Sequence, residues 1–312
     1  MKQWFTLAGI LIVVGGLIFT LSACSGGWNF GRKNVEKTVT VEDGFSAISI
    51  ETDTADISIL PSEDGSTKVV SSDIKKIIYN VSVENSVLKI KEEDTRKWFE
   101  SVFNMSVNTL TVYLPESEYA SLSISEDTGD IKVSDSFTFG KIDIDLSTGD
   151  TEIYADVTDA LKISGSTGDI KVEDITCGSL SVAVSTGDVE VSGVTCSGDV
   201  SVKVSTGDIS LSDISCDNLT TIGDTGNLDM TYVIASEKFT IERSTGDIKF
   251  NKCDAAEIYA KTDTGDVTGT LLSEKIFITN TSTGKVNIPE SITGGKCKIT
   301  TSTGDIKISI ED

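Results

Sequence analysis

Apolar and polar residues alternate with a period of two through most of the chain, and the alternation restarts after each Thr-Gly pair. Runs such as 170–172 (Ile-Lys-Val) after a turn and 180–182 (Leu-Ser-Val) before the next one are typical of short β-strands with one buried face. No unit shows the period of about 3.6 residues that marks an amphipathic helix. The pattern therefore predicts two short strands per unit, joined by a glycine-containing turn.

The Thr-Gly pairs recur every 19 or 20 residues, so the chain is an internal repeat. A two-strand unit of this size cannot bury its apolar face alone, whereas stacked units share a continuous core. We therefore expect an all-β, parallel β-solenoid (β-helix-like) of about ten 19–20-residue coils over residues 122–312, in preference to an antiparallel sandwich. The turn threonines are Thr128, Thr148, Thr167, Thr186, Thr206, Thr225, Thr245, Thr264, Thr283 and Thr303.

The residue between the two apolar positions of the strand after each turn should face solvent, and it alternates in charge along much of the repeat. Lys132, Glu152, Lys171 and Glu190 begin this column. Opposite charges on neighbouring strands stabilise a sheet by about 0.2–1 kcal/mol per pair. A register shift of one residue would bury the column, so the charges support the strand faces predicted from the apolar positions.

Residues 36–121 follow the repeat less closely, and we expect irregular N-terminal coils and a cap there. Residues 48–59 contain a degenerate copy of the strand–turn–strand unit, and residues 79–90 are typical of a β-hairpin. Apolar residues at helical spacing within 95–106 predict a short amphipathic helix that closes the end of the stack.

Residues 1–24 combine a short basic start, an apolar run and the ending Leu21-Ser22-Ala23-Cys24, as in a secretory signal. The last four residues resemble the bacterial lipobox, which implies lipid attachment at Cys24. An uncleaved helical anchor stays open, because the apolar run is just long enough to span a bilayer. Either anchor would hold the rest of the chain outside the cytoplasm on the bacterial cell membrane, with 25–35 as a linker.

Composition removes several classes of function. The chain has 49 acidic and 26 basic side chains and a net charge of −23, which argues against nucleic acid as a partner. It has no histidine, so a Ser-His-Asp or Cys-His nucleophile and a histidine-ligated zinc site are excluded. We expect no cofactor and no catalytic residue.

An aspartate follows the turn glycine in most units, and these aspartates should form one column. We interpret the column as turn structure, in which carboxylates accept hydrogen bonds from backbone amides. It is also a weak candidate for binding calcium ions, although Asn227 and Lys285 interrupt it in the sequence. Apart from this weak candidate, we predict no metal site. The members are Asp130, Asp150, Asp169, Asp188, Asp208, Asp247, Asp266 and Asp305.

Cys177, Cys196 and Cys216 occupy equivalent positions in successive units, and Ala235 and Ala255 continue their column. We expect buried thiols that act as small apolar fillers. A disulfide between neighbouring coils stays open as an alternative, because an extracytoplasmic setting permits it and the Cα atoms would lie within reach.

The segments Ser-Thr-Gly-Asp-Ile-Lys-Val at 166–172 and Leu-Thr-Val-Tyr-Leu-Pro at 110–115 resemble a widespread bacterial family of unknown function. The family consists of membrane-anchored β-strand-repeat proteins labelled as adhesins, and the resemblance covers roughly residues 36–312. It implies a non-enzymatic cell-surface adhesin or binding scaffold for an envelope or host-surface ligand. Two alternatives are an envelope-stress or regulatory partner of a membrane protein and a β-helix polysaccharide-active enzyme with paired carboxylates.

Overall fold

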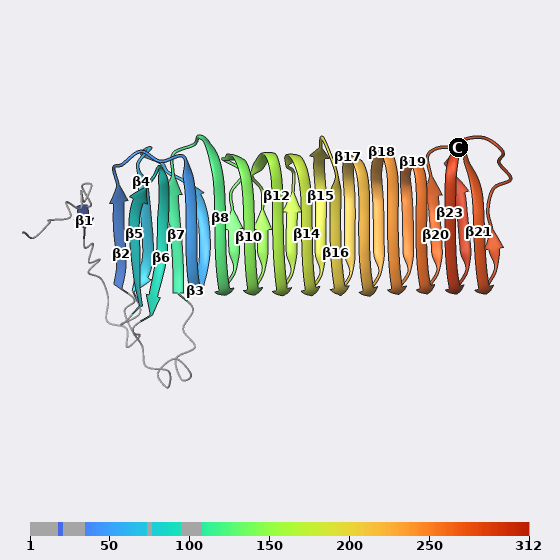
Figure 1. Cartoon of the computed structure of the whole chain (residues 1–312), viewed down its shortest axis with the longest axis horizontal. Coiled ribbons are helices and arrows are strands. Elements are labelled where there is room, and N and C mark those ends of the chain that lie inside the picture. The colour runs from blue at the N-terminus through green and yellow to red at the C-terminus, as the bar shows by residue number, and fades with distance from the viewer. Residues whose placement is uncertain (1–17, 21–34, 74–76, 95–107, 312) are drawn as a thin grey trace, which may run out of the picture.

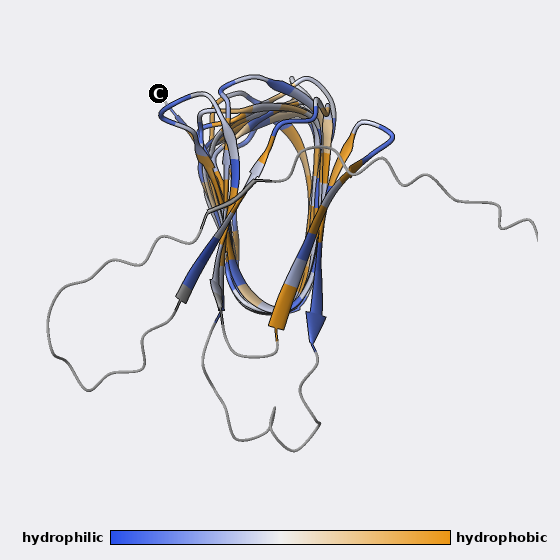
Figure 2. Ribbon diagram, turned by 90° about the vertical axis from the view of Figure 1, so that its left-hand side faces the viewer, coloured by the Kyte–Doolittle hydropathy of each residue, from blue (hydrophilic) through white to orange (hydrophobic). Residues whose placement is uncertain are grey.

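The computed structural model describes residues 18–20, 35–73, 77–94 and 108–311. Within these ranges all regular structure is β-strand, and the strands form one continuous sheet that winds into a rod (Figure 1). Viewed along the rod, the coils superimpose as an oval (Figure 2). The parallel β-solenoid predicted from the repeat is confirmed.

The strands are β1 (Ile18–Thr20), β2 (Val35–Val41), β3 (Ala47–Pro61), β4 (Thr67–Asp73), β5 (Ile77–Glu84), β6 (Val87–Asp94), β7 (Asn108–Leu114), β8 (Glu118–Thr128), β9 (Ile131–Val133), β10 (Thr138–Thr148), β11 (Thr151–Ile153), β12 (Asp156–Thr167), β13 (Ile170–Glu173), β14 (Thr176–Thr186), β15 (Val189–Cys196), β16 (Val200–Thr206), β17 (Ile209–Thr225), β18 (Leu228–Thr245), β19 (Ile248–Thr264), β20 (Val267–Leu271), β21 (Lys275–Thr283), β22 (Val286–Asn287), β23 (Gly295–Thr303) and β24 (Ile306–Ile310). Three of them, β17, β18 and β19, run from one turn to the next without a break.

Each regular coil descends along one wall of the oval, turns at Thr-Gly-Asp and ascends along the other. Neighbouring coils pair in parallel with a whole-unit register, as in Leu161↔Leu180 before the turn and Ile170↔Val189 after it. The predicted apolar columns therefore stack on themselves and are buried through the regular coils. The oval interior is the hydrophobic core of the protein.

The turn glycine is required because the next coil passes very close to it. Gly168 has φ +137°, and a Cβ atom built there would lie 1.9 Å from the carbonyl oxygen of Gly149. A side chain can occupy neither that backbone conformation nor that space without strain. The same geometry recurs at the other Thr-Gly turns, which explains why the repeat keeps this residue.

The last two coils are not stacked in sequence order. Strand β23 lies between β19 and β21, and β24 lies between β20 and β22. The C-terminal coil therefore lies between two coils that precede it in the sequence. The coil 275–287 is the outermost one at this end of the rod (Figure 1). Its apolar positions are less well covered: Val286 is 44 % exposed, whereas the equivalent Ile306 is 0 % exposed.

The N-terminal end shows a related insertion. Strand β3 lies between β8 and β6 on one wall and between β9 and β7 on the other. Farther out, β4 and β5 pair antiparallel with β7 and β6, and β2 pairs antiparallel with β4. The hairpin predicted over 79–90 is confirmed, with Asn85 and Ser86 at φ 53° and 62° in its two-residue turn.

Most of the predicted N-terminal anchor lies outside the described residues, as do Cys24 and the helix predicted within 95–106. The exception is β1, which pairs antiparallel with residues 38–40 of β2. The described part of the chain contains no helix with the length and apolarity needed to cross a membrane.

Candidate functional site

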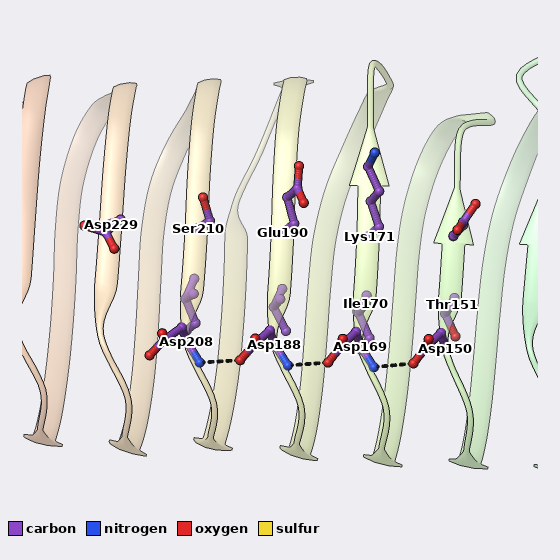
Figure 3. A pocket seen from close by; sticks show the side chains of 13 residues that line it. Asp150, Thr151, Asp169, Ile170, Lys171, Asp188, Glu190, Asp208, Ser210 and Asp229 are labelled. Atoms are coloured by element: carbon purple, nitrogen blue, oxygen red, sulfur yellow. Dashed lines mark hydrogen bonds between the residues drawn. The ribbon is translucent and has the colours of Figure 1, made fainter.

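The turn aspartates form a continuous hydrogen-bonded ladder along one edge of the rod. The backbone amide of Asp188 donates to Oδ1 of Asp169 at 2.8 Å, and the amide of Asp208 donates to Oδ1 of Asp188 at 2.8 Å. Figure 3 shows Asp150, Asp169, Asp188 and Asp208 in one row, each joined to the next. Asp130, Asp247, Asp266 and Asp305 accept in the same way.

The order of this ladder follows the order of the coils in space. The amide of Asp305 donates to Asp266 at 2.7 Å, and the amide of Lys285 donates to Asp305 at 2.7 Å. Lys285 therefore stands at the end of the ladder, and the expectation that it interrupts the column is wrong. Asn227 lies within the column and accepts a bond from the amide of Asp247 at 3.0 Å, so an amide oxygen replaces the carboxylate there.

A shallow groove of about 520 Å³ follows the middle of the ladder. It is lined by seven carboxylates and one lysine, Lys171, from turns and from the strands that follow them. The carboxylates are Asp150, Glu152, Asp169, Asp188, Glu190, Asp208 and Asp229. The groove is therefore strongly negative, and the solvent-facing residues predicted from the charge column make up one of its sides.

One end of the groove carries a polar cluster around Tyr154. The Tyr154 hydroxyl donates to Glu152 at 3.1 Å, and the Lys132 ammonium lies 2.6 Å from the same carboxylate and 5.2 Å from the ring centroid. The hydrogen bond from Lys132 lowers the pKa of Glu152, so this carboxylate stays ionised. The predicted pairing of charges between coils is observed here and at Lys249–Asp229, whereas Lys171 pairs with Glu173 on its own strand.

The ladder does not assemble the side chains of a known type of metal centre. Each aspartate already uses one carboxylate oxygen for a backbone amide. Among the described residues, no group of three or more Cys, Asp or Glu side chains converges on one point in a way that could hold a metal ion. The arrangement presents a row of single carboxylate oxygens to solvent, which suits contact with an extended cationic ligand better than chelation.

Two buried glutamates lie at the turn of the first coil, Thr54-Ala55-Asp56, which has no glycine. The ladder itself continues there, because the amide of Asp130 donates to Oδ1 of Asp56 at 3.1 Å. Glu126 is 2 % exposed and accepts hydrogen bonds from the amides of Ala55 at 3.0 Å and Thr128 at 3.3 Å. Burial raises the pKa of the Glu126 carboxyl to about 8. Glu92 accepts from the amides of residues 53 and 54, and burial raises its pKa as well.

Arg243 is a further buried charged residue that the apolar pattern did not predict. It is 3 % exposed, its three guanidinium nitrogens have no hydrogen-bond partner, and burial lowers its pKa. It pairs in register with Gly223, whose missing side chain leaves room for the guanidinium. Glu126 and Arg243 both lie two residues before a turn threonine, and the equivalent residues of other coils include the buried Leu146 and Val204. An apolar column that included this position would have predicted that both charged side chains point inward.

The cysteines lie where the column predicts. Cys177, Cys196, Cys216, Cys253 and Cys297 are all buried, which confirms the expected burial. Cys177 and Cys196 are in register on neighbouring parallel strands, and their sulfur atoms are 2.8 Å apart.

Comparison with solved structures gives matches at low sequence identity. A "putative lipid binding protein" from Parabacteroides distasonis ATCC 8503 is 16 % identical with a TM-score of 0.51, and the match covers 89 % of this chain and 98 % of that one. A "putative adhesin" from Bacteroides fragilis NCTC 9343 is 17 % identical with a TM-score of 0.45, covering 91 % and 100 %. At these identities the first similarity supports the fold alone.

Comparison with curated proteins gives no match. The family model described as Toastrack DUF4097 matches the chain twice, over residues 45–232 and 197–312, and so covers the whole solenoid and its irregular first coils. These ranges agree closely with the extent of the family resemblance found from the turn and strand motifs. The chain belongs to the Toastrack DUF4097 family.

Proposed function

We propose that this protein is a non-enzymatic, membrane-anchored binding protein of the bacterial cell surface, an adhesin or binding scaffold, and that the acidic groove along the aspartate ladder is its contact face. The groove itself carries the proposal, because it is the place where seven carboxylates from five successive coils line one continuous depression. The similar structure from Parabacteroides distasonis, described as a "putative lipid binding protein", is in keeping with a binding role.

The spacing of the carboxylates defines the kind of ligand that fits. Neighbouring coils of a parallel sheet are about 4.8 Å apart, so the groove offers a negative charge at each such step. An extended polymer with amino or guanidinium groups would meet several carboxylates at once, and the free energies of these weak contacts would add. Anionic polymers such as nucleic acids or acidic polysaccharides would be repelled.

Binding of poly-L-lysine of defined length to the purified full chain tests the groove. The double variant Glu190→Gln/Asp229→Asn removes two groove charges without touching the ladder hydrogen bonds. The double variant Glu237→Gln/Glu257→Gln removes two exposed charges elsewhere and serves as the matched control. We expect the groove variant to bind several-fold more weakly at low salt and the control to bind like the original protein. Equal binding by both variants would contradict the groove as the contact face.

The proposed anchor has a separate test. Lipid attachment at Cys24 predicts incorporation of a labelled fatty acid by cells that express the full chain, and loss of the label in Cys24→Ala. An unlabelled chain that remains in the membrane fraction would instead favour the uncleaved helical anchor.

A further inference from the structure

The Cys177–Cys196 pair differs from the other cysteines of the column. Their sulfurs are 2.8 Å apart, which is shorter than the about 3.5–4.0 Å at which even the smaller carbon atoms settle without a bond. Cys216 lies next in the same column, but its sulfur contacts the carbonyl oxygen of Ile234 at 3.9 Å. The hydrogen-bond partners of the Cys253 sulfur are likewise backbone oxygens, those of Met230 and Asn251. Packing of small apolar fillers therefore accounts for Cys216 and Cys253 but leaves the close contact of the first pair unexplained.

The backbone around the pair already suits a covalent bond. Cys177 and Cys196 face each other in register on adjacent parallel strands, and Cα atoms at this spacing fall within the range of about 4.4–6.8 Å found in disulfides. The sulfurs have to approach by only about 0.8 Å to reach the S–S bond length of about 2.05 Å. Side-chain rotation is enough for this, so the coils need not move.

We propose that Cys177 and Cys196 form a disulfide that joins successive coils of the solenoid. In the reaction, the Cys196 thiolate attacks the disulfide of an extracytoplasmic thiol–disulfide oxidant and expels one of its thiolates. The Cys177 thiolate then attacks the resulting mixed disulfide at the Cys196 sulfur and releases the second. Two protons leave the protein thiols, and two electrons pass to the oxidant, which becomes a dithiol.

The bond has a defined structural effect. The chain between residues 177 and 196 makes one complete coil, so the disulfide closes that coil into a covalent ring. The ring includes Asp188 and Glu190, two residues of the acidic groove. The oxidant acts while the coils assemble, because both sulfurs belong to residues that are buried in the folded rod. The cross-link would hold the middle of the groove at fixed coil spacing.

Peptide mapping tests the bond directly, because the tryptic peptide 172–203 contains Cys177 and Cys196 and no other cysteine. Full-length protein, expressed with its own N-terminal segment, is denatured and alkylated without reductant. We expect this peptide to be unalkylated and two hydrogen masses lighter than its reduced form, and to accept two alkyl groups after reduction. The peptides with Cys216 and Cys253 should be alkylated without reduction and serve as internal controls.

Formation of the disulfide in the cell depends on the proposed extracytoplasmic location. A second experiment therefore tests the disulfide independently of that location. Purified full chain is reduced, refolded in a glutathione redox buffer and mapped in the same way. Closure of the peptide in the buffer but not in the cell would support the pair and count against the location. Alkylation of both cysteines in both arms would overturn the disulfide.

Thermal unfolding gives an independent measurement. Cys177→Ala should fold, since Ala235 and Ala255 occupy the same column. Reductant should lower the Tm of the original protein and of the control Cys216→Ala by on the order of 5 °C, and should leave the Tm of Cys177→Ala unchanged. A Tm that is insensitive to reductant in all three proteins would contradict the proposal.

Discussion

The two ends of the rod are finished in different ways. At the N-terminal end, the antiparallel strands β2, β4 and β5 lie outside the first coils. The turn of β3 has Ala55 at the glycine position, and the buried Glu126 accepts a hydrogen bond from its amide. At the C-terminal end, the last coil lies between two earlier coils, and β21 has a strand partner on one side only among the described strands. The comparison shows that the turn and the stacking order, which are constant through the middle of the solenoid, both change near its ends.

The largest difference between the middle of the rod and its first coil is the need for glycine at the turn. Gly168→Ala should destabilise the protein by about 4 kcal/mol or more, because the new Cβ would meet the Gly149 carbonyl at a φ that alanine rarely adopts. Ala55→Gly, the reverse change in the first coil, should cost only about 0.5–1 kcal/mol. Urea denaturation monitored by circular dichroism measures both. A similar loss of stability in both variants would contradict the view that the first turn differs from the others in its need for glycine.

The buried Glu126 should give the first coil its own pH dependence. Its folded pKa of about 8 lies above the reference value of 4.5, so the folded protein holds a proton that the unfolded chain releases between these values. Its contribution to stability is therefore complete below pH 4.5 and is lost as the pH rises through 8. At about 1.4 kcal/mol per pKa unit, the loss amounts to about 3 kcal/mol after allowance for relaxation of the site.

Glu126→Gln keeps an acceptor oxygen for the Ala55 amide and removes the ionisation. Denaturation midpoints from pH 5 to 9 should therefore fall less steeply in the variant than in the original protein. Glu190→Gln, at an exposed position in the middle of the rod, is the control and should leave the slope unchanged. Identical slopes for Glu126→Gln and the original protein would show that this carboxyl does not carry the effect.

The order of the last coils can be tested with proline. Ile278 of β21 and Lys298 of β23 are partners in register, and both side chains are exposed. Lys298→Pro lies in a strand with partners on both sides and should cost about 2–3 kcal/mol, whereas Ile278→Pro lies in the outermost strand and should cost less than about 1 kcal/mol. Thermal unfolding of both variants decides the order. A larger cost at Ile278 would place β21 inside the rod.

The smallest effect is expected in the aspartate ladder. Asp169→Ala removes the acceptor of the Asp188 amide and should cost about 1 kcal/mol. Asp169→Asn should cost little, because Asn227 already accepts the equivalent hydrogen bond three coils farther along. Hydrogen exchange at the Asp188 amide reports the local change. Equal protection in Asp169→Ala and the original protein would show that the ladder contributes nothing to the turn.

The repeat made the coil predictable residue by residue. The alternation identified the walls, the apolar columns and the charged column, and the hairpin at 79–90 followed from two strands around a short turn. It could not reveal that Cys297 pairs with Ile258, because every unit has the same length and apolar positions, and each coil would fit equally well beside several others. Lys285 was misplaced for this reason. The burial of Glu126 was not predicted, because a charged residue type indicates an exposed position rather than a buried one.

The inserted coils at both ends have a consequence for how such a protein changes its length. Each end is closed by a specific set of non-consecutive contacts, whereas every unit in the middle joins only units like itself. A gene duplication or deletion of one unit between these ends would add or remove one layer and leave both ends intact. The length of the rod could then change in steps of about 4.8 Å, one layer at a time, without the evolution of a new fold.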